Sequence, residues 1–419
     1  MVIARNINAY SRSSADRWAN TRGLGLLPSY LGQVATRSYA PNNISTGFKS
    51  GNGQTFHIAR DNVSALQVAY ANWYSINAVH EAGSGGTFTV SASIQYPIAA
   101  NPDTGTWQQF KWSGALNTGA LADGAQSALS DILTLTTAIP RGAAFLLRWH
   151  GEASNQIPYW QYTASNSTAW LQVGEGNATP NFFSDKTAGG TISSGTSANN
   201  VYPCLIVGQT TRPSIYLMGD SRVLGTGDTF DTTGDTGELA RALGGYFAYI
   251  NLGCASETLQ AWLANNTKRQ ALIPYFSHFV SSMGINDVSG GRTAAQISAD
   301  IATAAALAKS LGSKKVLWGT ISPISTGSWA SVAAQSVSGS NANRYGVNQN
   351  LRDRQIAGVD QVFDISSLIE TDLNSGLWNV GYDGTAGVAL TADGIHCNYK
   401  GYQGIRRSNV VNPELVMQA

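Results

Sequence analysis

Three residues with the chemistry of acyl transfer stand in two short segments of this 419-residue sequence. Ser221 lies in LMGDSR, and Asp393 and His396 lie in ADGIHCN. A histidine can accept the proton of a serine hydroxyl, and a carboxylate can hold the imidazole in the accepting tautomer. Each segment alone is also typical of a turn or a helix start. Together they predict a nucleophile, Ser221, a general base, His396, and an orienting carboxylate, Asp393.

The same reaction needs hydrogen-bond donors for the oxyanion that forms on the attacked carbonyl group. The backbone N–H of Ser221 is one candidate. Gly253, in INLGCAS, can offer a second backbone N–H, and Asn286, in SSMGIND, can offer a side-chain amide. Either residue by itself is common in ordinary turns. Because all three follow apolar runs typical of buried strands, we expect them to meet at the carboxyl edge of one sheet and form an oxyanion hole.

The apolar runs that must position these residues all lie after residue 210. Helical patterns separate the runs, which predicts an α/β region with a parallel sheet covered on both faces. The five runs are residues 215–218, 247–252, 279–283, 316–318 and 362–365. One helix is specified in detail, because Thr293 and Gln296 form a capping box before an apolar stripe and Gly312 ends it.

In this order and context, Ser221, Gly253, Asn286 and His396 resemble the four signature residues of the SGNH, or GDSL, hydrolase superfamily. The resemblance covers residues 211–419. It implies a flavodoxin-like domain with the strand order 2-1-3-4-5. It also implies a serine esterase, a carboxylic ester hydrolase that requires no cofactor and no metal.

The sequence departs from the family pattern at Arg222, where the family's name has a leucine. Arg222 could point into the cleft and bind an anion or a sugar, or it could face solvent. With the neighbouring Asp220 it makes a pair of candidate substrate-binding residues. Residues 325–343 and 366–392 are long inserts, and the first, rich in Ser, Gly, Ala and Asn, is predicted to be a surface loop.

Residues 41–210 have a different sequence pattern. Short stretches in which apolar and polar residues alternate, such as 87–96 and 108–112, lie between clusters of Gly, Asn, Asp and Pro. This pattern predicts an all-β domain, either a sandwich or a jelly roll. It precedes the predicted catalytic domain, residues 211–419. Residues 1–40 are predicted to be a separate N-terminal segment.

The overall composition limits the classes of partner. Only 12% of the residues are charged and the net charge is +1, with no basic run, so nucleic acid is not an expected partner. The apolar runs are too short to span a bilayer, so no membrane contact is expected either. The first residues lack the apolar core of a secretion signal. The polar but weakly charged composition nevertheless suggests an extracellular or virion-associated protein.

The cysteines and acidic residues do not predict a metal site. Cys204, Cys254 and Cys397 are too few for a disulfide framework and lack the spacing of a zinc site. Cys254 and Cys397 directly follow the glycine and the histidine of the predicted site, so they form one bridge or remain two buried thiols. Three aspartates after the nucleophile do not match a calcium loop, and we expect a solvated loop there. They are Asp228, Asp231 and Asp235.

The four signature residues do not distinguish between ester substrates. Carbohydrate O-acetylesterases and phage tail deacetylases of this superfamily commonly carry β-sandwich partners, so the resemblance implies an acetylated polysaccharide. A lipase or aryl esterase, and a non-catalytic polysaccharide-binding or adhesin-like protein, are the alternatives. We expect one or two tryptophans of the β region to be exposed near the crevice at the carboxyl edge of the sheet, where the predicted site lies. Residues 159–162 are the segment most expected to supply them. The tryptophans of this region include Trp73, Trp107, Trp112, Trp149, Trp160 and Trp170.

Overall fold

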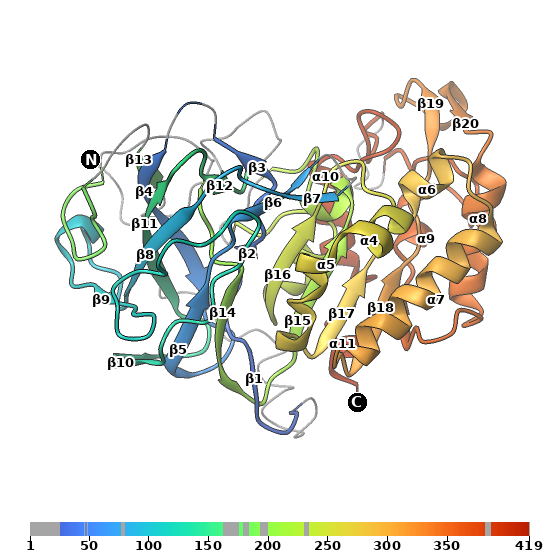
Figure 1. Ribbon diagram of the computed structural model, residues 1–419. Helices are drawn as coiled ribbons and strands as arrows, with labels where there is room; N and C mark the ends of the chain where they lie inside the picture. The colour runs from blue at the N-terminus through green and yellow to red at the C-terminus, as the bar shows by residue number, and fades with distance from the viewer. Residues whose placement is uncertain are drawn as a thin grey trace.

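The computed structural model describes residues 26–45, 47, 49–76, 80–161, 176–178, 184–192, 200–229, 234–381 and 387–418. They form two regions that lie side by side (Figure 1). The N-terminal region is built from antiparallel strands, and the C-terminal region contains a parallel sheet with helices on both faces. The predicted combination of an all-β part and an α/β part is therefore confirmed.

Two antiparallel sheets make up most of the N-terminal region. The first has the strand order β1-β14-β5-β10, with β1 (Tyr30–Gln33), β14 (Leu205–Thr210), β5 (Val63–Ala69) and β10 (Leu133–Ile139). The second has the order β13-β4-β11-β8-β9, with β13 (Gly176–Ala178), β4 (Ser50–Ile58), β11 (Ala144–Ala153), β8 (Phe88–Gln95) and β9 (Gln108–Gln109). Val68 of the first sheet and Ile94 and Leu147 of the second belong to one buried cluster. Because strand side chains alternate between faces, each sheet turns one apolar face towards this common core.

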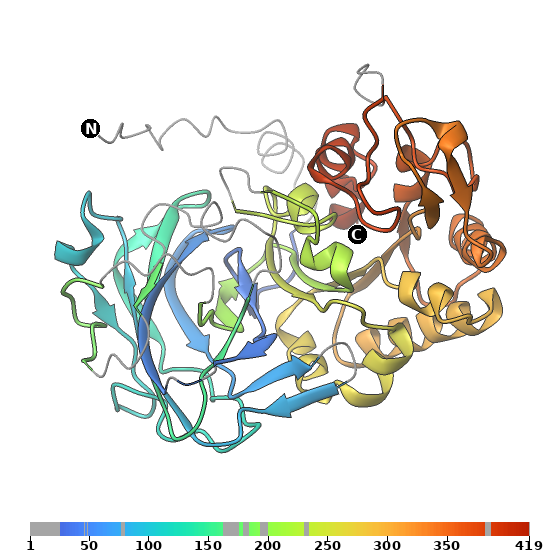
Figure 2. The same cartoon turned by 90° about the horizontal axis from the view of Figure 1, so that it is seen from above.

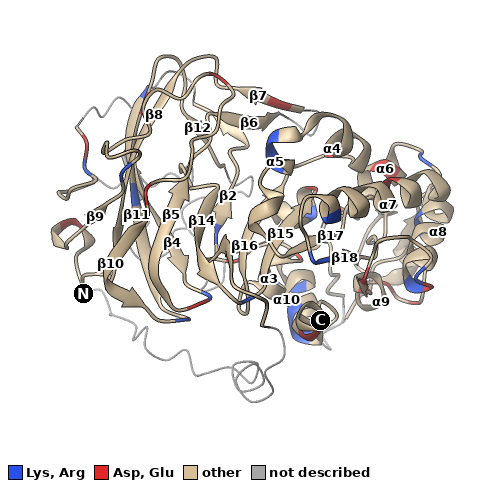
Figure 3. Ribbon diagram, turned by 60° about the horizontal axis from the view of Figure 1, so that its bottom comes forward, with Lys and Arg blue, Asp and Glu red and all other residues tan. Residues whose placement is uncertain are grey.

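Two short strand pairs complete the N-terminal region. Strand β3 (Asn43–Ile44) pairs with β12 (Pro158–Tyr159), and β6 (Trp73–Ile76) forms a hairpin with β7 (His80–Gly83). The β6–β7 hairpin lies beside helices α4 (Leu259–Asn265) and α5 (Thr267–Gln270) of the C-terminal region (Figure 3). It is therefore one of the places where the two regions meet.

The sheet of the C-terminal region is parallel throughout. Its own strands are β15 (Ser214–Gly219), β16 (Ala248–Gly253), β17 (His278–Ser281), β18 (Lys315–Gly319) and β21 (Gln361–Phe363). Their spatial order is β16-β15-β17-β18-β21, which is the predicted order 2-1-3-4-5. Strand β2 (Ser38–Tyr39), from the start of the chain, adds a sixth strand beside β16. The fold-class prediction is thus confirmed, with one strand more than the sequence indicated.

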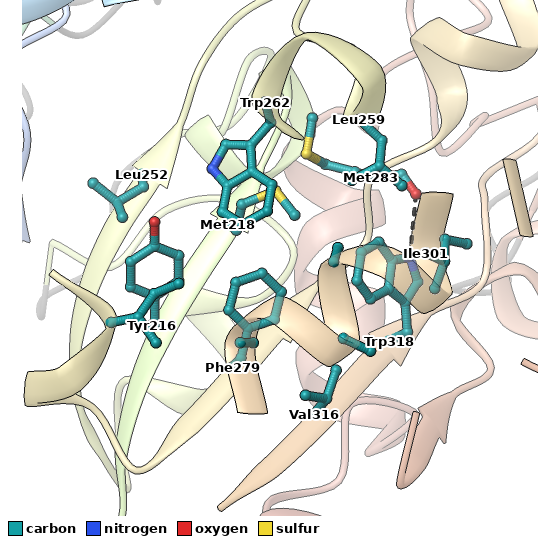
Figure 4. Packing of buried hydrophobic residues seen from close by; sticks show 14 of the residues in the cluster. Tyr216, Met218, Leu252, Leu259, Trp262, Phe279, Met283, Ile301, Val316 and Trp318 are labelled. Carbon is teal, nitrogen blue, oxygen red and sulfur yellow. Dashed lines mark hydrogen bonds between the residues drawn. The ribbon is translucent and has the colours of Figure 1, made fainter. Parts of the chain in front are cut away.

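Alternating residues of these strands face two different helical layers. Tyr216 and Met218 of β15 pack with α4, α7 (Ala294–Ser310) and α8 (Asn341–Arg352), as Figure 4 shows for part of the cluster. Ile215 and Leu217 face the opposite layer. That layer contains α3 (Ala240–Leu243), α9 (Ile365–Ile369), α10 (Tyr399–Ser408) and α11 (Pro413–Met417). Helix α7 has the predicted capping box of Thr293 and Gln296.

The structure distributes the predicted segments differently in two places. The described part of residues 1–40 is shared between the regions, since β1 pairs with β14 whereas β2 joins the parallel sheet. Residues 325–343 are not only a loop, because β19 (Ser325–Gly327) and β20 (Gln335–Val337) form a hairpin before α8 begins. We call residues 325–337 the β19–β20 hairpin.

The two regions share a hydrophobic core as well as a sheet edge. Trp73 and Leu205 of the N-terminal region lie in the same buried cluster as Tyr216 and Trp262 of the C-terminal region. Seen from above in Figure 2, the blue and green strands of the first region stand directly against the yellow-green strands of the second. In the part of the chain that the structure describes, no helix is both long and apolar enough to cross a membrane.

Candidate active site

Ser221 is the first residue of a short helix, α2 (Ser221–Leu224), at the carboxyl end of β15. Asp220 caps this helix, and its side chain accepts a hydrogen bond from the Arg222 N–H at 2.9 Å. A Cβ atom on Gly219 would overlap the Val223 side chain. Glycine is therefore required for α2 to pack closely onto the end of the strand, and this packing holds Ser221, the predicted nucleophile, in place.

His396 and Asp393 complete a chain of two hydrogen bonds that starts at the Ser221 hydroxyl group. The distance from Ser221 Oγ to His396 Nε2 is 2.7 Å, and that from His396 Nδ1 to Asp393 Oδ2 is also 2.7 Å. Partial burial opposes ionisation of Asp393, but hydrogen bonds from the His396 ring and from the N–H groups of His396 and Ile395 hold the pKa of its carboxyl group well below the usual range. Asp393 therefore stays negatively charged, as a group that orients and stabilises an imidazolium must.

The loop that carries Asp393 and His396 is held by its own hydrogen bonds and by the inserts around it. Thr391 Oγ1 donates to the His396 carbonyl at 2.7 Å. The Gly394 carbonyl accepts from the Trp378 indole N–H at 2.9 Å and from the Ser325 N–H at 3.0 Å. Residues of both predicted inserts, 325–343 and 366–392, thus hydrogen-bond to the loop that carries Asp393 and His396. We call residues 391–398 the catalytic loop because they contain the predicted base and its carboxylate.

The three predicted oxyanion donors differ in whether their N–H groups already have a hydrogen-bond acceptor. The Ser221 N–H lies in the first turn of a helix, where N–H groups have no intrahelical acceptor. Asn286, partly exposed, donates from Nδ2 to the Glu257 carbonyl at 2.9 Å and keeps a second amide hydrogen. The Gly253 N–H, in contrast, already donates to Asn251 Oδ1 at 2.9 Å. A Cβ on Gly253 would overlap the backbone of Leu224, so this glycine allows α2 to approach β16.

The loop after β16 contains a donor that the sequence did not indicate. Ser256 is exposed and has a left-handed backbone with φ of 62°, which is uncommon for a residue other than glycine. Among the described residues its N–H has no hydrogen-bond acceptor. The sequence gives no signal for this conformation at a serine, because a left-handed backbone is typical of glycine and asparagine.

Arg222 and Asp220 are not placed to contact a substrate. Both side chains are fully buried, whereas the sequence suggested a position in the cleft or in solvent for Arg222. The Arg222 guanidinium donates to Ser322 Oγ and to the Ser282 carbonyl, and it lies 3.7 Å from Glu238 Oε1. The guanidinium is held in the interior because buried carboxylates compensate its charge there.

Other residues singled out in the sequence are also buried. Asp228 pairs with Arg241, and Asp235 accepts a hydrogen bond from the Tyr249 hydroxyl at 2.6 Å, so these two do not form a solvated loop. Asp231 lies outside the described residues. The three cysteines are buried thiols, and Cys254 and Cys397 form no disulfide bridge. Within the described ranges, no group of three or more His, Cys, Asp or Glu side chains is arranged to hold a metal.

The expected exposed tryptophans of the β region are absent from its described part. Trp73, Trp107, Trp112, Trp149 and Trp160 are all buried, whereas Trp170 and Tyr162 lie outside the described residues. Trp160 stacks on Tyr39 with ring centroids 4.2 Å apart. A partly exposed indole near the catalytic loop comes instead from Trp329, which lies in the β19–β20 hairpin. Its ring reaches so close to Gly394 that a Cβ there would overlap it.

Comparison with known proteins gives one family match. Residues 217–403 match the model of the GDSL-like lipase/acylhydrolase family. No curated protein matches the chain. Solved structures that resemble it include a G-D-S-L family lipolytic protein from Veillonella parvula (17% identity, TM-score 0.34, 48% of this chain and 97% of that chain). Others are an acetylxylan esterase from Geobacillus stearothermophilus (16%, 0.34, 48% and 94%) and a GDSL-like lipase from Bacteroides thetaiotaomicron (15%, 0.31, 48% and 87%).

Proposed function

Since the C-terminal region of this chain belongs to the SGNH (GDSL) hydrolase superfamily and is a hydrolase acting on esters, we propose that the protein is a serine O-acetylesterase that deacetylates a polysaccharide. The observation that carries the esterase mechanism is the continuous chain of hydrogen bonds from Ser221 through His396 to Asp393. Ester hydrolysis by Ser221, His396 and Asp393 requires no cofactor and no metal.

The mechanism follows from the donor and acceptor roles in that chain. As Ser221 Oγ attacks the acetyl carbonyl carbon, His396 Nε2 accepts the hydroxyl proton. The tetrahedral intermediate collapses, the bond to the sugar oxygen breaks, and His396 returns the proton to that oxygen. Water then attacks the acetyl-enzyme in the same way and releases acetate, which restores Ser221. Asp393 remains ionised and stabilises the positive imidazolium in both halves of the reaction.

We assign the stabilisation of the oxyanion to N–H groups that have no acceptor among the described residues. These are the Ser221 N–H, the second amide hydrogen of Asn286 and the Ser256 N–H. Each such donor contributes on the order of 3 kcal/mol to the transition state. Gly253 serves as a donor only if its N–H leaves Asn251, so we assign it primarily to the packing of α2.

The polysaccharide substrate is supported by the surroundings of the catalytic loop. Trp329 presents part of an indole beside Gly394, and an aromatic face can stack on a sugar ring. The same hairpin favours a second candidate, a lipase or aryl esterase, because Val332 and Val337 are 37% and 42% exposed there and could contact an acyl chain. The two candidates predict opposite chain-length preferences. The non-catalytic alternative is disfavoured because Ser221, His396 and Asp393 are already in contact.

The test compares acetate release from acetylated polysaccharides with hydrolysis of short and long p-nitrophenyl esters, using the whole chain. We expect release from the polymer, a preference for acetyl esters, and complete loss in Ser221→Ala. Trp329→Ala should lower activity on the polymer but not on p-nitrophenyl acetate, whereas Tyr345→Ala, at an exposed aromatic of α8, should change neither. A preference for acyl chains of about eight carbons or more would favour the lipase, since each added buried methylene contributes about 0.8 kcal/mol. Undiminished turnover by Ser221→Ala would contradict the mechanism itself.

A further inference from the structure

We infer that the N-terminal β region is part of the esterase machinery, because a buried Glu81–Arg269–Glu257 bridge positions Asn286 from the β6–β7 hairpin. This inference rests on the proposed function, in which Asn286 is an oxyanion donor. It assigns Glu81, Arg269 and Glu257 as positioning residues, none of which contacts the substrate.

The first half of the bridge joins the two regions of the protein. Glu81, on β7, accepts hydrogen bonds from the backbone N–H groups of Lys268 and Arg269, both at 2.7 Å. Its Oε1 also lies 3.3 Å from Arg269 Nε, and the two side chains are only 2% and 1% exposed. Figure 3 shows the acidic part of β7 beside the basic α5. A carboxylate of the β region therefore fixes both the backbone and the side chain of a helix in the C-terminal region.

The second half of the bridge leads from Arg269 to the loop after β16. Both terminal nitrogens of the guanidinium donate to the Glu257 carboxylate, with Nη1 to Oε2 at 2.8 Å, and Glu257 is fully buried. Asn266 Nδ2 donates to the same carboxylate at 3.1 Å. Bidentate pairing with a planar guanidinium restricts the orientation as well as the distance of the carboxylate. The side chain of Glu257 is thereby fixed.

The backbone of Glu257 holds the proposed oxyanion donor. Its carbonyl accepts the hydrogen bond from Asn286 Nδ2, and the Leu259 N–H returns a bond to Asp287 Oδ2 at 2.9 Å. On the other side of the loop, the Cys254 N–H donates to the Gly219 carbonyl at 2.9 Å, two residues before Ser221. The orientation of the Asn286 amide thus depends on where the bridge places Glu257.

The β region also supports the same loop through aromatic packing. Tyr39, Trp160 and Tyr202 form a buried cluster with Leu224, the last residue of α2, and Ala255 packs against it. Ala255 lies between Cys254 and Glu257 in the loop. Contacts from the β region therefore reach the loop after β16 at two points, one polar and one apolar. Removing the β region would release both contacts.

The test is a double-mutant cycle between Glu81 and Asn286 in the whole chain. Glu81→Ala should lower kcat for p-nitrophenyl acetate about 10-fold and leave KM within about 2-fold, because oxyanion donors act mainly in the transition state. Glu81→Gln should recover only part of the loss, since its one amide oxygen can still accept from one of the two α5 N–H groups. In the Asn286→Ala background, Glu81→Ala should change kcat by less than about 2-fold, because residues acting through one group are not additive. Rates are normalised to active sites titrated by the acyl-enzyme burst, so partial unfolding does not count as lost kcat.

A matched control is available within the β region. Asp103→Ala removes the acidic partner of another buried arginine, Arg148, at 2.8 Å, and the contacts of this pair with described residues all lie within the β region. We expect it to lower thermal stability and leave kcat unchanged. Glu257→Gln, a second variant, should lower kcat as Glu81→Ala does.

The outcomes separate the inference from the function on which it rests. Full kcat in Glu81→Ala, or a loss that is equally large with and without Asn286, would overturn the positioning role while Ser221→Ala still abolishes turnover. An unaffected Ser221→Ala would instead overturn the esterase mechanism. If Asn286→Ala alone has no effect, the positioning role falls but the nucleophile stands.

Discussion

Ser221 Oγ lies 2.7 Å from His396 Nε2, although 175 residues separate the two in the sequence. Ser221 comes from the end of the central strand β15, and His396 comes from the loop before α10. The fold itself thus brings the two groups within hydrogen-bond distance.

The first prediction separates the two functions of Asp393. Its Oδ2 orients the His396 ring, and its Oδ1 accepts from the N–H groups of Ile395 and His396 at 2.9 and 2.8 Å. Asp393→Asn removes the charge but keeps the acceptor for the loop, so kcat should fall while thermal stability is retained. Because the side chain is 51% exposed and water can reach it, we expect a loss below the roughly 10⁴-fold of a buried triad aspartate. Asp393→Ala should lose both the orientation of His396 and the support of the loop. Both kcat and Tm should therefore fall, and these are the two quantities to measure.

If Asp393→Asn and Asp393→Ala have the same Tm, the loop does not depend on Oδ1. Wild-type kcat in both variants would show that Asp393 has no part in orienting the ring.

The second prediction concerns Gly253, the last residue of β16, and Ser256 in the loop that follows it. Gly253→Ala should be destabilised by about 1–3 kcal/mol, because its Cβ would overlap Leu224 and force α2 to move. Ser256→Ala should keep its activity, since the proposed donor is the backbone N–H, and Ser256→Gly should keep it as well because glycine tolerates the left-handed conformation. Chemical denaturation and kcat measure the two effects. A large loss in Ser256→Ala would assign the role to the hydroxyl group instead.

The third prediction concerns the buried carboxyl group of Glu238. Burial raises its pKa, although Arg222 and a hydrogen bond from Ser282 oppose this, and Oε2 has no hydrogen-bond partner among the described residues. The unfolded chain loses the proton near the ordinary value of about 4.3, and the folded protein loses it at higher pH. The folded state then binds more protons within this interval, so this group lowers stability as the pH rises.

Glu238→Gln lacks this titration. The difference in Tm between Glu238→Gln and the wild type should therefore shift in favour of the variant as the pH rises from about 4.5 towards neutrality. A Tm difference for Glu238→Gln that moves the opposite way would mean that Arg222 stabilises the ionised form.

The fourth prediction concerns the thiols. Burial raises the pKa of Cys204 to about 12 and that of Cys397 well above its usual range. Because the thiolate is the reactive species, the native protein should react slowly with a thiol reagent. Under denaturing, non-reducing conditions three thiols should titrate, in agreement with three cysteines that form no disulfide bridge. Only one thiol in denaturant would instead indicate a bridge such as Cys254–Cys397.

The sequence by itself determined the features that depend on short-range patterns. The five strands of the parallel sheet, the capping box of α7 and the segments around Ser221 and His396 could all be recognised, because periodicity and spacing are local properties. The three-residue interval from Asp393 to His396 likewise fixed a pair that needs no distant part of the chain. The all-β character of residues 41–210 followed from alternation in the same way.

Only the tertiary structure decided how distant residues share the interior. Arg222 was expected in the cleft or in solvent, but Glu238 and Ser322, from other segments, compensate it in the core. The hydrogen bond from the Gly253 N–H to Asn251 and the left-handed conformation of Ser256 likewise became visible only in the tertiary structure. The contact between Glu81 and Arg269 spans 188 residues, and no periodicity or motif encodes such a pair. It exists because two regions with separate sequence patterns fold around one common hydrophobic cluster.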